Sequence, residues 1–329
     1  MLKIATFNVE NLDDKPDGKN PILAERAPVL RRNLLRLDAD ILCLQEVHAQ
    51  ELPEHTSSNP KRNFAALDEV LSGTRYQNYL KAHTVTSSNT PYDVRNLLVL
   101  VNPLFGLDFN QYRNSVIDTL QYRKVTAQPG EDDAKEVTWE RPILHAQVTV
   151  PDLGLVHILN LHLKSRLASN IPGQKLGFHW RSAAGWAEGY FLSSIKRVGQ
   201  ALEARILLDQ LFTQDPNAKI IVCGDFNSEP GEVPVEAICG RVENTDNPDL
   251  RHTVLVPCSL GIAESIRYSH LHQGRGNLLD HMLISQALLP YFHSAHIHNE
   301  NLHDESLPFA SDRKYPESDH APFLAEFNV

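Results

Sequence analysis

The chain has 329 residues, 42% of them hydrophobic, with a formal net charge of -10 at pH 7 and a pI near 5.9. This length and apolar content can bury a sizeable core. No linker, fixed-period repeat or long charge run divides the chain, so we expect one domain over residues 1–329. The acidic charge argues against a protein that coats nucleic acid by bulk electrostatics, but it leaves room for a local basic groove.

The chain begins directly with strand-like sequence and lacks the features of a secretory signal. As written, we expect it in the cytoplasm, or secreted if a leader has been removed. Cys43 and Cys223 lie inside apolar runs and no cysteines have Cys-x-x-Cys spacing, as in a reducing compartment. No apolar run could span a bilayer, so we expect no stable membrane association. We also expect a monomer.

The first predicted elements are a strand, a helix and a strand. Residues 2–7 form a strand that ends at Asn8-Val-Glu-Asn11. Apolar residues then recur with helical spacing over 22–37, and the apolar strand 41–44 ends in Gln45-Glu46. Both strands are therefore followed directly by polar side chains.

The remaining predicted elements continue this mixed α/β order. They are a helix at 64–71, strands at 96–101, 143–150 and 155–161, a helix at 195–206, and strands at 219–223, 278–284 and 319–327. Two connections, 122–140 and 166–190, are predicted to be loops. Loops of this length in a compact chain are often functional.

The strand 219–223 is the clearest example of an apolar strand that is followed directly by polar residues. Its continuous apolar residues indicate a strand that is covered on both faces. Gly224 permits a close turn, and Asp225 and Asn227 follow on the same side of the extended chain. Alone, Asp-x-Asn after a strand is usually turn chemistry, but here several strands end or begin in polar residues.

In antiparallel neighbours, the start of one strand lies beside the end of the next. Polar residues at strand ends and at strand starts are therefore expected to line one rim. These residues are Asn8, Glu46, His162, Asp225, Asn227, Asp280, Asp319 and His320. Clustered carboxylates repel one another, and oxygen-rich ligation favours Mg²⁺ or Mn²⁺ over zinc. Such an ion beside imidazoles suits hydrolysis of a phosphate ester.

Six sequence blocks resemble, in order, the signature blocks of the endonuclease/exonuclease/phosphatase superfamily, which includes deoxyribonuclease I and exonuclease III. The blocks are Phe7-Asn-Val-Glu-Asn-Leu12, Gln45-Glu-Val47, Asn160-Leu-His-Leu-Lys-Ser165, Gly224-Asp-Phe-Asn227, Leu279-Asp-His-Met-Leu-Ile284 and Ser318-Asp-His-Ala-Pro322. The resemblance extends from Ile4 to Phe327. It implies a four-layer α/β/β/α sandwich, with two packed mixed β-sheets flanked by helices, and a divalent-metal phosphoesterase that uses Mg²⁺ or Mn²⁺.

The resemblance also implies a role for each matching residue. Glu46 is similar to the principal metal ligand of the family, with Asn8, Glu10 and Asp319 in or near the shell of the metal. Asp225 and Asn227 resemble the pair that orients the attacking water and the phosphate. His320 resembles the histidine that faces the scissile phosphate, with Asp280 as its partner. His162 matches a histidine of the deoxyribonuclease-like branch.

Arg95 stands where many family members have Arg-Gly-Ile and would contact the substrate, although Asn96 replaces the glycine. Other polar residues have simpler structural interpretations. We interpret Arg141-Pro142 as structural. The histidines at 293, 296, 298 and 303 are interpreted as part of a solvated connection and not as a second metal site.

The resemblance leaves the substrate open. The Trp-Cys-Asp-Arg block of inositol phosphatases and the Asn-x-Asn-Gly start of repair enzymes are both absent. Arg267-Tyr-Ser, Gly274-Arg-Gly and Leu279-Asp-His-Met-Leu-Ile284 instead resemble bacterial deoxyribonuclease-like members, which favours a nuclease acting on a phosphodiester such as DNA or RNA. A phosphodiesterase or phosphatase of small or lipid substrates is the alternative. A catalytically dead binding module would lack one of Glu46, Asp225, Asn227 or His320, and all four are present.

The segment 164–197 is expected to fold over the rim. Its Lys164 and Arg181 would bind phosphates that flank the scissile one, and Trp186 would stack on bases. The competing interpretation is that its tryptophans anchor the loop and its cations are solvated.

Overall fold

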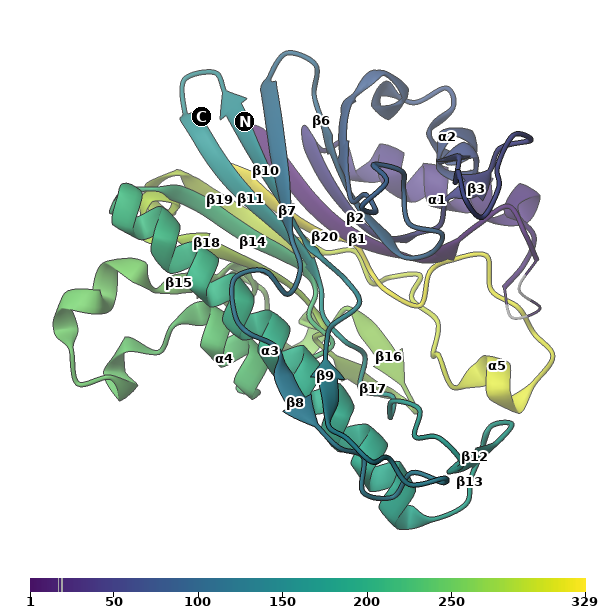
Figure 1. Cartoon of the computed structure of the whole chain (residues 1–329). Helices are drawn as coiled ribbons and strands as arrows, with labels where there is room; N and C mark the ends of the chain where they lie inside the picture. The colour runs from purple at the N-terminus through teal and green to yellow at the C-terminus, as the bar shows by residue number, and fades with distance from the viewer. Residues whose placement is uncertain (17, 19) are drawn as a thin grey trace.

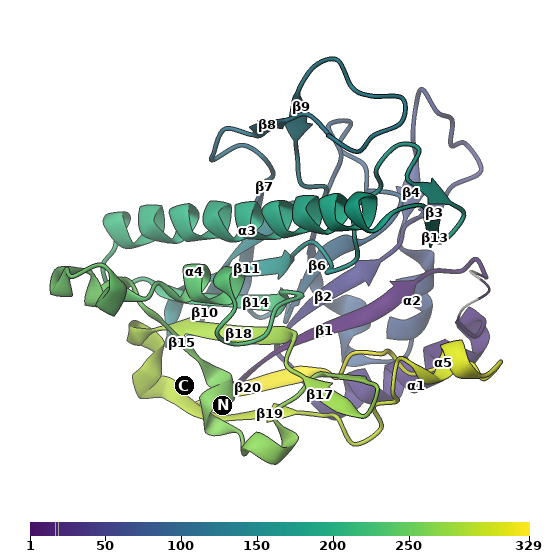
Figure 2. The ribbon, with the colours of Figure 1, turned by 90° about the horizontal axis from the view of Figure 1, so that it is seen from below.

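The computed structural model describes residues 1–16, 18 and 20–329. Two six-stranded mixed sheets pack face to face (Figures 1 and 2). The first sheet contains, in spatial order, β19 (Phe292–Ile297), β20 (Phe323–Phe327), β1 (Leu2–Leu12), β2 (Ile41–Val47), β6 (Asn96–Val101) and β5 (Leu80–His83). The second contains β15 (Leu255–Pro257), β18 (Asp280–Ser285), β14 (Lys219–Asp225), β11 (Gly154–His162), β10 (Ile143–Val150) and β7 (Gly106–Tyr112).

Helices cover the outer face of each sheet and complete four layers. They are α1 (Leu23–Leu37) and α2 (Ala65–Leu71) on the first sheet, and α3 (Ala183–Gln214) and α4 (Val233–Cys239) on the second, while α5 (Leu307–Ala310) lies in the connection that precedes β20. Three apolar clusters match the three boundaries between layers, and the middle one joins Ile41 of the first sheet to Ile221 of the second. The predicted α/β sandwich is therefore confirmed.

The pairing of the strands explains why one edge of both sheets is polar. β1 runs parallel to β2, and β11 runs parallel to β14, so their carboxyl ends lie at one edge. β20, β6, β10 and β18 run antiparallel to these strands and begin at that same edge. We call this edge the rim. The arrangement is the one predicted from polar residues at strand ends and strand starts.

The predicted boundary between the loop 166–190 and the following helix is wrong, because α3 begins at Ala183 and not near residue 195. Ser182 caps the helix by accepting a hydrogen bond from Gly185 N at 2.9 Å. Gly185 and Gly189 weaken the helical pattern in the sequence. In the fold both are required, since a Cβ would lie 2.5 Å from Gln174 and 2.3 Å from Ser169 respectively.

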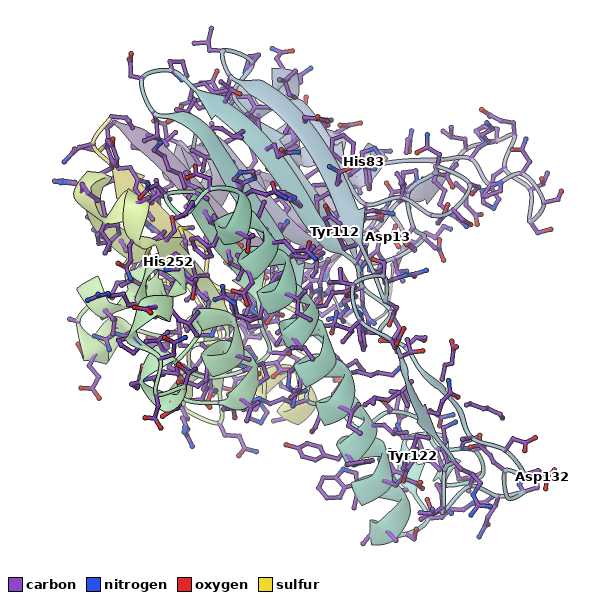
Figure 3. The ribbon with its side chains drawn as sticks, turned by 60° about the vertical axis from the view of Figure 1, so that its left-hand side comes forward. Asp13, His83, Tyr112, Tyr122, Asp132 and His252 are labelled. Carbon is purple, nitrogen blue, oxygen red and sulfur yellow. The ribbon has the colours of Figure 1, made fainter. Side chains whose placement is uncertain are left out.

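A group of short strands projects beyond the rim together with the first turns of α3. It contains β8 (Leu120–Tyr122), β9 (Lys135–Val137), β12 (Lys175–Leu176) and β13 (His179–Trp180). Figure 3 shows Tyr122 and Asp132 on this group, away from Tyr112 and Asp13 at the sheets. The predicted loop 122–140 therefore contains a strand. We call residues 120–137 and 165–190 the projecting segment.

The other short elements lie around the two sheets. They are the pairs β3 (Gln50–Glu51) with β4 (Arg62–Asn63) and β16 (His270–His272) with β17 (Arg275–Asn277), and the 3-10 helices η1 (Arg75–Asn78), η2 (Val242–Asn244), η3 (Pro248–Thr253), η4 (Cys258–Gly261), η5 (Glu264–Ile266) and η6 (Gln286–Tyr291). Across the described ranges, no helix combines the length and the apolar character needed to cross a bilayer.

Candidate active site

The carboxylates at the first sheet's end of the rim stand on irregular backbone. The register of β1 and β2 shifts between Asn8 and Leu12 opposite Gln45 and Val47, which forms a β-bulge. Glu10 and Glu46 both have left-handed backbone angles here, with φ of 48° and 61°. Such angles are costly for residues other than glycine and are found mainly where the structure needs a particular side-chain direction. The bulge therefore turns both carboxylates toward the rim.

Three carboxylates meet at this bulge. Glu10 Oε2 accepts a hydrogen bond from Asp319 N at 3.0 Å, and Glu46 Oε2 accepts one from Asn11 N at 3.0 Å. Burial, with the added repulsion of Asp319, raises the pKa of Glu10 to about 8. Burial alone would raise the pKa of Glu46 too, but its interactions with His162 and with the Arg141 guanidinium lower it. The surroundings therefore favour the protonated form of Glu10 and the ionised form of Glu46.

Asp225 is the centre of the second sheet's contribution. Its Oδ2 accepts hydrogen bonds from Asn8 Nδ2 and Asn227 Nδ2, both at 3.1 Å, and its Oδ1 accepts one from Asn227 N at 2.8 Å. His162 Nε2 lies 3.3 Å from Asp225 Oδ2 and 3.5 Å from Glu46 Oε1. Burial opposes the charge of Asp225, but His320 and these donors outweigh burial and lower its pKa. The Asp225 carboxylate is therefore ionised and held in one orientation.

Gly224 allows β14 to lie close to β11 within the second sheet, next to Asp225. It has φ of 128°, and a Cβ there would lie 1.9 Å from the carbonyl oxygen of Leu161. No other residue type could occupy this position without moving β11 away from β14. The close turn predicted at Gly224 is thus a close contact between two strands.

His320 and Asp280 form a buried pair at the starts of β20 and β18. His320 Nδ1 lies 2.7 Å from Asp280 Oδ2, and His320 Nε2 lies 3.9 Å from Asp225 Oδ2. Burial alone would lower the pKa of His320, but the carboxylates, first Asp280 and then Asp225, raise it well above its usual value. The imidazole is therefore charged, with Nδ1 committed to Asp280 and Nε2 facing the rim.

His281, the next residue, has a different environment. Its Nε2 lies 2.8 Å from the carbonyl oxygen of Ser228, and its ring stacks on Phe226 with centroids 4.9 Å apart. Burial lowers the pKa of His281, which keeps the ring neutral. His281 therefore packs the turn after Asp225 and does not face the rim.

Four cations line a pocket of about 450 Å³ beside Glu46, on the side of β6 and β10. They are Arg95, Arg113, Arg141 and Lys164, and the carboxylates of Asp93 and Glu140 also line the pocket, so cations outnumber carboxylates by four to two. We call it the cationic pocket. Burial and the nearby Arg141 lower the pKa of Lys164 to about 8. The structural interpretation of Arg141 was therefore incomplete, because Arg141 is buried within Coulombic reach of Glu46 and Asp225 while it donates to the Leu163 carbonyl at 2.7 Å.

The hydrogen bonds of the Asn96 side chain explain how this chain forms the turn at Arg95 without the glycine that many family members have at position 96. The Asn96 side chain is buried, donates to the carbonyl oxygens of Val47 (3.0 Å) and Tyr92 (2.7 Å), and accepts from Tyr92 N at 2.9 Å. These bonds hold the turn in which Arg95 takes a φ of 59°. An asparagine side chain here fixes the turn by hydrogen bonding.

The structure does not bring Arg181 and Trp186 to the rim. Arg181 N donates to the Gln174 carbonyl, and Trp186 stacks on Tyr190 in the first turns of α3 with centroids 5.4 Å apart. Among the described residues, no recorded contact joins either side chain to Glu46, Asp225 or His320. The expectation that residues 164–197 cover the rim is therefore corrected: Lys164 lines the cationic pocket, and the rest of the segment projects beyond it.

The histidines after residue 292 are also more ordered than predicted. His293 and His296 lie exposed on β19, and His303 stacks on Tyr315 with centroids 4.2 Å apart.

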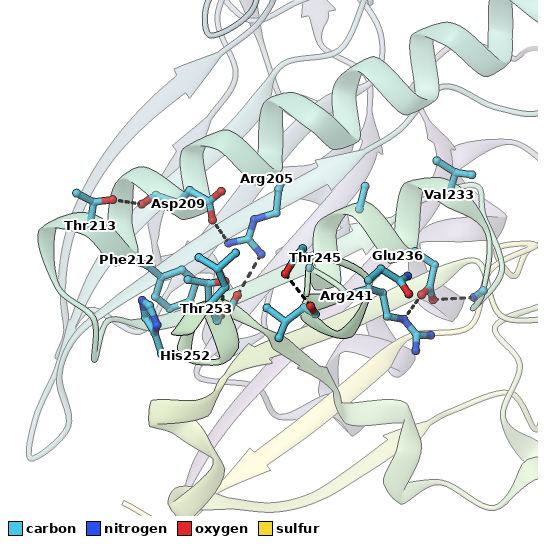
Figure 4. A pocket seen from close by; sticks show the side chains of 16 residues that line it. Arg205, Asp209, Phe212, Thr213, Val233, Glu236, Arg241, Thr245, His252 and Thr253 are labelled. Carbon is cyan, nitrogen blue, oxygen red and sulfur yellow. Dashed lines mark hydrogen bonds and ion pairs between the residues drawn. The ribbon is translucent and has the colours of Figure 1, made fainter. Parts of the chain in front are cut away.

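A second, larger pocket of about 810 Å³ lies away from the rim, between α3, α4 and residues 240–253 (Figure 4). Arg205 crosses it and donates to the carbonyl oxygens of Ile238 and Thr253. No predicted site residue lines this pocket.

A two-sheet sandwich with helices outside, and with clustered carboxylates and an Asp–His pair at one rim, defines the class of metal-dependent phosphoesterases. The profile of the Endonuclease/Exonuclease/phosphatase family matches residues 5–320. The chain therefore belongs to this family, whose members hydrolyse phosphoester bonds and generally depend on a divalent metal.

Solved structures of this fold align over the whole chain. Truncated TDP2 from Caenorhabditis elegans is 15% identical, with a TM-score of 0.55 and coverage of 100% of this chain and 97% of that one. A mannosyl-6-phosphatase from Bacteroides thetaiotaomicron is 14% identical (TM-score 0.57, 100% of both chains), and an AP endonuclease from Archaeoglobus fulgidus is 15% identical (TM-score 0.52, 100% of both). At these identities the likeness shows the fold alone. No curated protein sequence matches the chain.

Proposed function

We propose that the chain is a divalent-metal-dependent phosphodiesterase that cleaves nucleic acid. The observation that supports this best is the cationic pocket beside the rim in a chain whose net charge is -10. Burial, and after it the charge of Arg141, lower the pKa of Lys164, while Glu140 in the same pocket acts in the opposite direction. A nucleic acid presents a second phosphate next to the scissile one, and that phosphate would bind the cations of this pocket.

The residues at the bulge fit a divalent cation. Glu10, Glu46, Asp319 and the Asn8 amide form an oxygen-rich donor set. Burial, and after it the charge of Asp319, raise the pKa of Glu10, and a cation bound there would favour its ionised form. When bound there, Mg²⁺ or Mn²⁺ would supply charge stabilisation for the phosphoryl oxygens.

The remaining residues have separate roles in the proposed reaction. Asp225, ionised and fixed, would accept a hydrogen bond from the attacking water and orient it toward phosphorus. His320, charged because of Asp280, would donate from Nε2 to a phosphate oxygen on which charge develops. Asn227 Nδ2 is committed to Asp225 and to the Leu163 carbonyl, so in this structure Asn227 positions Asp225.

A panel assay tests the proposal. Duplex DNA, single-stranded DNA, RNA and bis-p-nitrophenyl phosphate would be incubated with and without Mg²⁺ or Mn²⁺. We expect metal-dependent cleavage of at least one nucleic acid with a higher kcat/KM than for the small diester. Hydrolysis of the small diester with no cleavage of any nucleic acid would contradict the nuclease proposal.

A substitution in the cationic pocket tests whether this pocket binds the substrate. Arg113→Gln removes a cation that lines the pocket without touching the carboxylates, and Arg251→Gln in η3 is the matched exposed control. We expect Arg113→Gln to raise KM for DNA by about tenfold and to reduce its salt dependence, with the small diester unaffected. Equal behaviour of the two variants would show that the pocket does not bind the substrate.

One observation favours a lipid phosphodiester as the second candidate. A pocket of about 470 Å³ along α3 is lined mainly by apolar side chains, and several of them are exposed, including Leu120, Phe191 and Leu202. Exposed apolar surface of this kind can contact acyl chains. Cleavage of phosphatidylcholine or sphingomyelin vesicles, without cleavage of nucleic acid, would support this candidate over the first.

A further inference from the structure

We propose that His270, Glu305 and Asp319 form a transition-metal site beside the proposed active site, with zinc as the metal that fits best. One ligand atom from each of these residues lies within 4.8 Å of the others. The three come from β16, from the connection after β19 and from the residues before β20. This inference does not depend on the identity of the phosphoester substrate.

The sequence His270-Leu-His272 places two imidazoles on one side of a strand. Alternate residues of a strand point to the same face, and these two rings lie nearly parallel, with centroids 6.3 Å apart and 14° between their planes. A single oxygen, Glu305 Oε2, lies 3.0 Å from His270 Nε2 and 3.2 Å from His272 Nδ1. This grouping of two imidazoles and a carboxylate is a typical start of a zinc site.

Glu305 is held in place by backbone contacts with the same strand pair. Glu305 N donates to the Leu271 carbonyl at 2.8 Å. The neighbouring Asp304 accepts hydrogen bonds from Gln273 N at 3.0 Å and Gly274 N at 2.6 Å, in the turn between β16 and β17. The carboxylate is therefore preorganised, which lowers the entropic cost of closing a metal site.

A second observation points to a ligand. The other ring nitrogen of His270, Nδ1, is buried and has no hydrogen-bond partner among the described residues, and the residue as a whole is only 8% exposed. A buried imidazole normally has a partner for both nitrogens. A metal on Nε2, the nitrogen that faces Glu305, would fix the ring proton on Nδ1, whereas a metal on Nδ1 would give that atom the partner it lacks.

The donor types select the metal. Imidazole nitrogen with carboxylate oxygen favours zinc over Mg²⁺, whereas the carboxylates and amide at the bulge favour Mg²⁺ or Mn²⁺. The charged His320 ring lies 5.4 Å from the His270 ring and would repel a cation, but Asp280 and Asp225 neutralise that charge. Asp319 borders both sites, because its N donates to Glu10. Zinc here would fix Asp319 next to the bulge.

The test measures zinc binding in the absence of substrate. Isothermal titration with Zn²⁺ would compare the wild-type chain with Glu305→Gln and His272→Ala, both on partly exposed side chains. His296→Ala is the matched control, because His296-Ile-His298 repeats the same spacing but belongs to neither group of converging metal-ligating side chains found among the described residues. We expect Glu305→Gln to weaken the tightest zinc site by about 100-fold, and His272→Ala by about tenfold or more. The control should leave it unchanged.

Cobalt separates this site from the bulge. Co²⁺ bound by imidazole in a four- or five-coordinate site absorbs strongly in the visible range, and all-oxygen octahedral Co²⁺ absorbs weakly. We expect a strong band in wild type and in Glu46→Gln, and its loss in Glu305→Gln. A band lost in Glu46→Gln and retained in Glu305→Gln, or zinc affinities equal in wild type, Glu305→Gln and His272→Ala, would overturn the inference. Failure to cleave nucleic acid would not.

Discussion

At the scale of single residues, the proposed chemistry depends on backbone angles that most residues avoid. Glu10, Glu46, Arg95 and Asn227 all have positive φ. Each such residue costs on the order of 1 kcal/mol or more, and the surrounding fold must supply this stability. Four of these positions at one rim indicate that side-chain direction at the rim is maintained against local backbone preference.

Glu46→Gln tests the role of the bulge. Glutamine retains the size of the side chain and an acceptor for Asn11 N, but it removes the charge, so the affinity for Mg²⁺ should fall by at least about tenfold and the rate with it. A Mg²⁺ titration of bis-p-nitrophenyl phosphate hydrolysis measures both. Glu51→Gln on β3 is the exposed control. Full wild-type activity in excess chelator would refute the metal requirement.

His320 and His281 are neighbours of Asp280 with opposite expected effects. His320→Ala removes the charged imidazole that faces the rim, so kcat should fall about 100-fold or more, and Asp280→Asn should reduce it less. His281→Ala removes a buried ring that packs on Phe226, so it should lower Tm while the folded enzyme keeps most of its kcat. Equal and mild losses of kcat in both alanine variants would show that the Asp280–His320 pair has no catalytic role.

At the scale of elements, helices and strands with a long regular apolar pattern could be predicted from the sequence, and elements with an irregular pattern could not. The helix 22–37 and the strands 96–101 and 143–150 were predicted from the sequence with bounds near those observed, because burial imposes a clear period on them. The first turns of α3 were missed, since the glycines that fit its neighbours weaken the helical pattern. The bulge of β1 and β2 was missed as well, because an extra residue in a strand leaves no periodic signal.

The pairing of β10 with β11 creates a histidine pair whose titration affects stability. His145 Nε2 lies 3.0 Å from His157 Nδ1 on the outer face of the second sheet. Burial, reinforced by His157, lowers the pKa of His145 to about 4. The unfolded chain therefore binds the proton more tightly than the folded chain between about pH 6.5 and 4, and stability is lost as the pH falls through this window.

His145→Gln should remove that dependence. From the lowered pKa, His145 accounts for about 2 kcal/mol of unfolding free energy lost between pH 7 and pH 5. Urea unfolding at the two pH values would measure it, with the exposed His252→Gln as the control. A wild-type loss of stability that is identical in His145→Gln would mean that other groups account for the acid sensitivity.

At the scale of the whole molecule, the rim was predictable and its surroundings were not. Eight rim residues could be named from the sequence because strand ends and strand starts follow the hydrophobic pattern. Arg141 and the His270–Glu305 contact could not, since they depend on how segments distant in sequence pack together. His270-Leu-His272 was the signal available for the second site, and only the approach of Glu305 and Asp319 distinguishes it from His296-Ile-His298.

The projecting segment extends the molecule beyond the rim (Figure 1). Trp186, 47% exposed, and Arg181 lie on it. Under the nuclease proposal, Arg181→Ala and Trp186→Ala should raise KM for long DNA by several-fold and flatten its salt dependence, while a short oligonucleotide and the small diester respond little. If all substrates respond alike, the segment stabilises the fold and does not bind nucleic acid.

The contact between the two sheets also has a consequence for how the molecule opens. Cys43 on β2 and Cys223 on β14 face each other across the interior, and all four cysteines are buried free thiols. Their mutual hydrogen bond and burial raise the pKa of Cys43 well above its usual value, so the thiol does not react while the sheets are together. The reaction of Cys43 and Cys223 with a disulfide-exchange reagent would therefore report the rate at which the sheets separate. Zinc and magnesium bound at the proposed sites should each slow that reaction in proportion to their binding to the folded protein. The reaction rate of these two thiols would therefore measure metal occupancy.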